Sequence, residues 1–169
     1  YSIKVGSNNG VYFCGGTKGS VLTGTAGTYK STFQGGSRDG YIAHLNQNTG
    51  AIVGATYIGT SAYDQTFLLD LDKFNNVYVF GQTLGTYPVS PNVYYNQSGK
   101  QFIHKLNSSL STSVFSTVFG RGQGSIDIVP TALNVDDCLN ILVSGWGGAT
   151  NATYLGGRMI NLPVTPDAV

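Results

Sequence analysis

The sequence contains no glutamate, and all eight of its acidic residues are aspartate. Charge of either sign is scarce: 10% of the chain is Asp, Glu, Lys or Arg, against roughly 25% in an average soluble domain. Methionine and tryptophan occur once each. Helical proteins depend on Glu, Lys, Ala, Leu and Met. The composition therefore excludes a helical bundle and disfavours an α/β fold.

Strong net charge and long apolar segments are missing too. The formal net charge is +1, whereas a nucleic-acid partner requires a basic stripe on the protein. No apolar run approaches the roughly 20 residues of a membrane-spanning helix. We therefore expect no nucleic-acid partner and no membrane span. Residues 1–5 already have a strand-like composition with no signal peptide before them, and residues 162–169 stop without a finishing strand, so we expect a piece of a longer protein.

Glycine and aromatic residues are abundant instead. The 169 residues include 24 Gly, 11 Tyr and 8 Phe, and 41% are hydrophobic, which is enough for a core and argues against disorder. Gly, Asn, Ser and Thr favour turns, while β-branched and aromatic residues favour strands. The composition predicts an all-β fold.

An internal repeat runs through the sequence. Gly15, Gly81 and Gly145 close three copies of one segment, so the period is about 65 residues. The copies are residues 9–17, 75–83 and 139–146, and the other repeated segments are 41–46 with 102–107, 55–59 with 117–120, and 3–5 with 69–71 and 133–135. Four segments that recur in the same order argue against coincidence.

Each repeated segment has the composition of a short strand. In the second copy these strands are predicted at residues 67–71, 77–81, 101–106 and 113–119. Four antiparallel strands per repeat are typical of a β-propeller blade, which must stack on other blades to bury its faces. We predict blade one at 1–60, blade two at 61–121 and a partial blade three at 122–169, about two and a half blades of a larger propeller. An open stack of sheets is the alternative.

The repeat resembles a known family, the SBBP-type β-propeller repeats of large bacterial surface proteins. The segments that carry the resemblance are residues 75–83, 88–94, 102–107 and 116–120. Residues 136–148 and 162–165 are similar to a blade variant of gliding Bacteroidota-type bacteria. The resemblance implies secretion, commonly by the type IX route, and display at the outer surface of the cell. Because propellers host many activities, it implies a fold more strongly than a function.

No catalytic or metal-binding constellation is visible in the sequence. Cys14 and Cys138 could form one disulfide or remain two buried thiols. His44 and His104 lie one step out of register in aligned segments, so we expect them on opposite faces and not as a metal pair within one layer between blades. The aspartates lack the spacing of a calcium loop, and we interpret them as turn-forming. We expect no cofactor and no metal.

The predicted binding residues lie on the excursions between second and third strands. Trp146 stands beside Gly147, and the insertion that follows holds Tyr154 and Arg158. Loop-borne aromatic and arginine side chains give large contact area at low entropy cost, so these three are the predicted anchors. Trp146 packing as a wedge between blades is the alternative.

The sequence thus predicts a non-enzymatic module of a secreted or cell-surface bacterial protein. Its role would be that of an adhesin or binding platform, with surface proteins or glycans as partners and the type IX secretion machinery as a partner during export. Two alternatives remain open. One is part of a propeller-fold, glycan-active extracellular enzyme whose catalytic residues lie outside this segment, and the other is a structural scaffold in a surface assembly.

Overall fold

The computed structural model describes residues 1–20, 24–147 and 161–168, and these consist of strands and loops with no helix. The strands are β1 (Ser2–Val5), β2 (Gly10–Thr17), β3 (Asp39–Asn46), β4 (Ile52–Ile58), β5 (Asp64–Leu71), β6 (Val77–Thr83), β7 (Gln101–Leu106), β8 (Ser113–Phe119), β9 (Ile128–Val135) and β10 (Ile141–Gly147). The all-β prediction is confirmed for this part of the chain. None of its segments forms a helix with the length and apolarity to cross a membrane.

The strands form three antiparallel sheets that follow the order of the chain. We call β1–β4 the first sheet, β5–β8 the second sheet and β9–β10 the hairpin. Within each sheet, strands that are consecutive in the sequence pair with each other. The predicted four-stranded antiparallel repeat is confirmed in the first two sheets. Strands β7 and β8 have the predicted bounds, whereas β5 begins earlier and β6 ends later than predicted.

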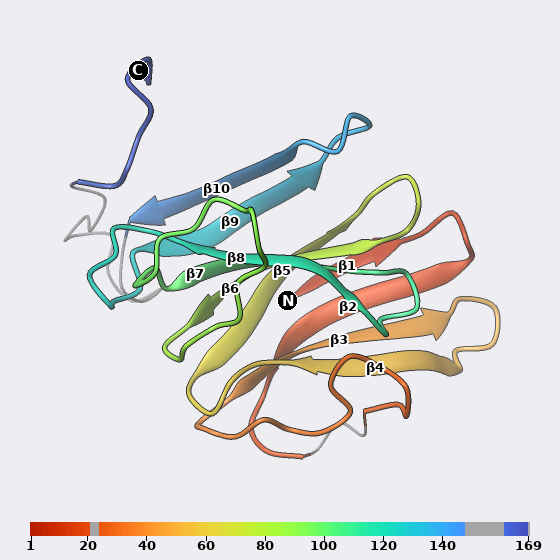
Figure 1. Cartoon of the computed structure of the whole chain (residues 1–169). Coiled ribbons are helices and arrows are strands. Elements are labelled where there is room, and N and C mark those ends of the chain that lie inside the picture. The colour runs from red at the N-terminus through yellow and green to blue at the C-terminus, as the bar shows by residue number, and fades with distance from the viewer. Residues whose placement is uncertain (21–23, 148–160, 169) are drawn as a thin grey trace.

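The three sheets are stacked face to face, with the second sheet in the middle (Figure 1). One core joins Tyr12, Cys14 and Ile42 of the first sheet to Val77, Val79, Phe102 and Leu106 of the second. The other core joins Tyr78, Phe80 and Ile103 to Ile128 and Leu133 of the hairpin. Because side chains alternate along β6, both of its faces are covered and all seven of its residues are buried.

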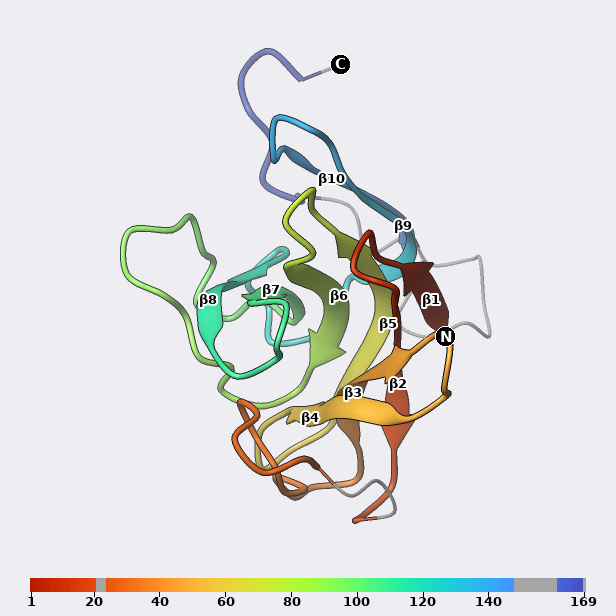
Figure 2. The ribbon, with the colours of Figure 1, turned by 90° about the vertical axis from the view of Figure 1, so that its right-hand side faces the viewer.

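The first strands of the two sheets and of the hairpin, which are β1, β5 and β9, converge. Strand β5 contacts both β1 and β9 (Figure 2). Asp70 of β5 ties them together: its Oδ1 lies 3.1 Å from Lys4 Nζ of β1, and its Oδ2 accepts a 2.8 Å bond from the Val135 amide of β9. One carboxylate therefore links all three sheets at their first strands.

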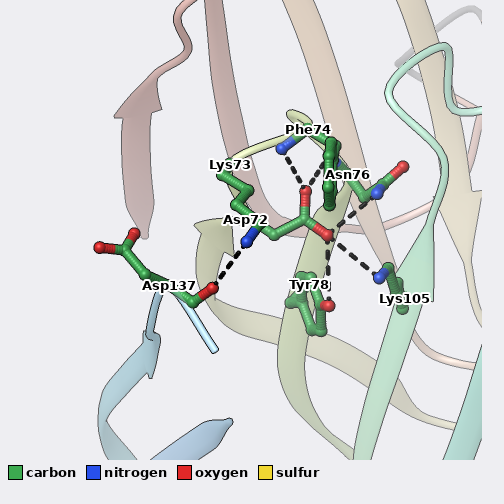
Figure 3. A network of polar contacts seen from close by, with 7 residues as sticks. All are labelled: Asp72, Lys73, Phe74, Asn76, Tyr78, Lys105 and Asp137. Carbon is green, nitrogen blue, oxygen red and sulfur yellow. Dashed lines mark hydrogen bonds and ion pairs between the residues drawn. The ribbon is translucent and has the colours of Figure 1, made fainter. Parts of the chain in front are cut away.

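At one end of the stack lie the turns between first and second strands, which we call the turn end. Asp72 organises the turn between β5 and β6 (Figure 3). Its carboxylate accepts hydrogen bonds from the Phe74 and Asn76 amides and forms an ion pair with Lys105 at 3.0 Å. Lys73 donates to the carbonyl of Asp137 in the hairpin turn at 3.0 Å. The turn-forming role predicted for these aspartates is thus seen at Asp72, whose carboxylate is almost fully buried.

Candidate functional site

A cavity lined by both polar and apolar side chains lies at the opposite end, where the chain crosses from one sheet to the next. We call it the crossover pocket. It has a volume of about 770 Å³, within the range of small-molecule sites. Its polar lining includes Lys18, Arg38, Tyr63, Gln65 and Gln82, and its apolar lining includes Phe67, Leu68, Val129 and Pro130. The starts of β5 and β9 and the end of β6 meet there.

A hydrogen-bond cluster fixes the polar wall. The Oε1 atom of Gln65 accepts bonds from the Tyr63 hydroxyl at 3.1 Å and from Arg38 Nη1 at 3.4 Å. Gln82 donates through Nε2 to the carbonyl of Ile128 at 2.9 Å, which orients its side chain across the gap between the second sheet and the hairpin. These side chains are held in place before any ligand arrives, which lowers the entropy lost on binding.

The pocket is positively charged. Lys18 and Arg38 line it, and no carboxylate from the described residues does. Burial raises the pKa of Tyr63, although nearby Arg38 acts in the other direction, so its hydroxyl stays protonated at neutral pH. An arginine fork, a lysine and a phenol beside the Phe67 ring suit a ligand that carries an anionic group and an apolar face.

A second cavity of about 610 Å³, which we call the outer groove, lies between the outer strands of the second sheet and the hairpin. It is mostly apolar and lined by Phe80, Tyr94, Ile103, Phe119, Val143 and Leu162, among others. Among the described strands β10 pairs only with β9. Residues of β10, including Val143, line this groove. The groove continues the second core rather than presenting a chemically distinct site.

The structure places one of the three predicted anchors. Trp146 is half-buried on β10, directly across from Val129, which lines the crossover pocket. Tyr154 and Arg158 lie outside the described residues.

The structure does not join the two cysteines in the disulfide that the sequence left open. Both thiols are free. Cys14 is buried in the core between the first and second sheets, and that burial raises its pKa to about 11. Cys138 is exposed in the turn between β9 and β10, so the alternative of two buried thiols holds only for Cys14.

The two histidines lie on opposite faces of their sheets, as predicted. His44 stacks on Tyr12 at 4.0 Å between ring centroids, and His104 bonds to Tyr87 at 2.8 Å. Tyr12 and Tyr87 belong to the same core. The inference that opposite faces mean separate layers is therefore wrong, because opposite faces of successive sheets meet. No group of three or more potential metal ligands occurs among the described residues.

In comparisons with known proteins, no family model matches the chain, and no curated protein gives a significant match.

Sequence reasoning missed the residues that line the crossover pocket. Lys18 and Arg38 lie at the two ends of the first excursion, but Tyr63 and Gln65 lie on the chain entering and forming β5. The available signal was positional. In a repeat of antiparallel strands, the ends of second strands and the starts of first strands gather at one end, and polar residues at those positions become neighbours.

Proposed function

We propose that this chain is a non-enzymatic binding module built of stacked propeller blades, and that its crossover pocket takes an anionic ligand such as an acidic glycan. The observation that carries the proposal is the composition of the pocket: Lys18, Arg38 and Tyr63 converge with no carboxylate among its described lining. The converging first strands and the face-to-face sheets support the propeller assignment, because propeller blades stack around a central channel.

The display of this module on a bacterial surface is part of the same proposal. It is supported by the resemblance of residues 75–83 and 102–107 to SBBP-type repeats and by the low charge of the chain. A binding role is favoured over glycan hydrolysis because most hydrolysis uses two carboxyl groups facing one bound sugar, and the tyrosine-nucleophile alternative needs a cluster of arginines. The described lining of the pocket holds one arginine and no carboxyl group, and its amide, phenol and cationic groups suit binding.

The test compares acidic with neutral oligosaccharides in titration calorimetry. We expect oligouronates to bind and neutral glucans of equal length to bind at least tenfold more weakly, with affinity falling as salt rises. In the double variant Lys18→Gln, Arg38→Gln we expect at least a tenfold loss of oligouronate affinity. Lys73→Gln removes a cation at the turn end and is the matched control, with unchanged affinity.

Equal binding of acidic and neutral sugars, or equal affinity of the double variant and the native chain, would contradict the proposal. The predicted excursion anchors are tested in the same assay by Trp146→Ala, Arg158→Ala. A loss of affinity at an unchanged melting temperature would assign the ligand to the excursions rather than to the crossover pocket.

A further inference from the structure

Two aspartates lie side by side behind the wall of the crossover pocket. Arg38 and Tyr63 form a parallel bridge between chains entering β3 and β5, and the Asp64 amide donates to the Arg38 carbonyl at 2.9 Å. The next pair along this bridge is Asp39 and Asp64. Directly paired residues on neighbouring strands have their side chains on the same face, and such strands lie about 4.8 Å apart. Arg38 and Tyr63 face the pocket, so the two carboxylates face the interior.

Both carboxylates are buried and incompletely bonded. The side chains of Asp39 and Asp64 have no exposed surface. One oxygen of each is satisfied: Asp39 Oδ2 accepts from the Gln34 amide, and Asp64 Oδ2 accepts from the Thr60 amide and hydroxyl at 2.6 Å. The Oδ1 atom of each has no hydrogen-bond partner. A buried acceptor without a partner is costly, and two ionised carboxylates side by side are costlier still.

At the equivalent crossover between the second sheet and the hairpin, both oxygens of the buried carboxylate accept hydrogen bonds. There Asp127 is paired with Arg121, whose Nε donates to Oδ1 and whose amide donates to Oδ2, both at 2.8 Å. A neutral Gln101 packs beside it, and with its amide suitably oriented its oxygen accepts from the Asp127 and Ile128 amides. The second crossover therefore balances one carboxylate with one guanidinium, whereas the first holds two carboxylates.

Within the described part of the chain, one cation, Lys30, compensates the first crossover. Lys30 donates through Nζ to the Gly59 carbonyl at 2.6 Å, and its charge attracts both Asp39 and Asp64. Three ionised groups would leave one negative charge buried. Two free oxygen atoms are too few for a calcium ion, which takes six to eight oxygen ligands. A single proton needs no further ligands and removes the excess charge.

We propose that Asp39 and Asp64 form a proton-binding site that takes up one proton from solvent in mildly acidic conditions and so stabilises the first crossover. The proton resides on Asp39, and the charge that remains on Asp64 is balanced by Lys30. Burial, chiefly, and the neighbouring Asp64 raise the pKa of Asp39 to about 6, against the bond from Gln34 and the charge of Lys30.

The surrounding titratable groups come from every element packed on the site. They are Tyr29, Lys30 and Arg38 before β3, Tyr63 before β5, Tyr87 between β6 and β7, and His104 on β7. His104 is the one among them that opposes Asp39 in the same pH range, because burial lowers its pKa to about 3. A difference between native and variant chains at each pH removes its contribution.

The test is equilibrium unfolding of the native chain and of Asp39→Asn between pH 4 and pH 7. A folded pKa raised from 3.8 to about 6 makes the native fold progressively less stable as pH rises through this range, up to a plateau. Relative to the native chain, the unfolding constant of Asp39→Asn should therefore fall by about 50-fold between pH 4 and pH 7. This slope does not depend on any constant cost of the substitution.

Two further measurements make the proposal sharper. Carboxyl ¹³C NMR should show Asp39 titrating near pH 6, and Lys30→Gln should move that midpoint upward because it removes a neighbouring positive charge. Asp137→Asn deletes an exposed-turn carboxyl at the turn end and should not reproduce the change in slope.

Three results would each overturn the proposal. They are parallel pH profiles of the native chain and Asp39→Asn, an Asp39 carboxyl that titrates below pH 4.5, and a rise in melting temperature on addition of calcium at pH 7.5 that Asp39→Asn abolishes. The last result would assign the site to a metal ion instead of a proton.

Discussion

The three repeat turns place one residue each in the left-handed backbone region. Asn9, Asn75 and Leu139 occupy equivalent positions with φ of 57°, 62° and 69°. Asparagine tolerates this conformation, whereas other residues pay about 1–2 kcal/mol. We expect Leu139→Asn to raise the free energy of unfolding by about 1 kcal/mol in urea denaturation. The reciprocal Asn9→Leu should lower it, and a neutral or destabilising Leu139→Asn would show that the Leu139 side chain contributes packing.

The carboxylate of Asp72 is the most heavily bonded polar group of the turn end. Asp72→Asn keeps its size but removes the ion pair with Lys105, and we expect a loss of about 3 kcal/mol at pH 7. Burial raises the pKa of Asp72, but bonds from Asn76 and Lys105 outweigh it and lower the pKa below 3.8. The stabilisation is present above pH 3.8 and is lost as pH falls through the lower folded pKa, so native and variant stabilities should converge in strong acid.

The matched control is Asp136→Asn, which alters the equivalent turn of the hairpin. Asp136 binds Asn140 through both oxygens but has no buried ion pair. A loss as large as that of Asp72→Asn would show that the turn geometry, rather than the Lys105 pair, accounts for the effect.

At the scale of elements, the contact of β7 with the excursion that follows β6 and with β8 has an acid-sensitive point at His104. Its Nδ1 and Nε2 atoms both hydrogen-bond at 2.8 Å, to Tyr87 and Ser113, and it is fully buried. Burial, with a smaller contribution from Lys30, lowers its pKa to about 3. The unfolded state therefore binds the proton first, and the native stabilisation declines as pH falls below 6.5. We expect a loss of up to about 1.4 kcal/mol per pH unit relative to His104→Gln.

The measurement is a set of denaturant titrations from pH 7 to pH 4 on both chains. If the difference between the native chain and His104→Gln stayed constant over that range, the imidazole would have to be solvated or charged in the fold.

The elements themselves were predictable because strand composition is local. Residues 101–106 and 113–119 are rich in strand-forming apolar and aromatic residues and are bounded by turn-forming residues, and the two strands have the predicted bounds in the structure. The pocket was not predictable in this way. Arg38 meets Gln65 only because a non-local parallel bridge joins two connecting segments, and no pattern within either segment records that pairing. The histidines illustrate a related limit, since their faces followed from register but their shared layer followed from stacking.

At the scale of the whole molecule, the two ends of the stack expose apolar side chains. Val5, on the far face of the first sheet, and Leu142 of the hairpin are 65% and 53% exposed. By the repeat, the face that bears Val5 is equivalent to the face of the second sheet packed on the first. We expect the 169-residue chain to self-associate head to tail, with an average mass that rises with concentration in light scattering after size exclusion.

Leu142→Lys and Val5→Lys should each reduce that association, because a charge would have to be buried in the contact. Val164→Lys changes an exposed apolar residue outside every strand and is the control. A chain that remains monomeric up to millimolar concentration would mean that both ends are stable when exposed to water.

The unlike faces of each sheet have an evolutionary consequence. One face of a unit fits the opposite face of the next, as Tyr12 and Cys14 fit Val77 and Val79. A tandem gene duplication of one unit therefore yields a copy that can pack on its parent at once, without inventing a new interface. Afterwards the two faces of each interface can change together, independently of the other interfaces. His44 of the first sheet and Lys105 of the second occupy equivalent positions, and this difference is expected of such divergence. Recombination can then change the number of units while the fold of each is inherited.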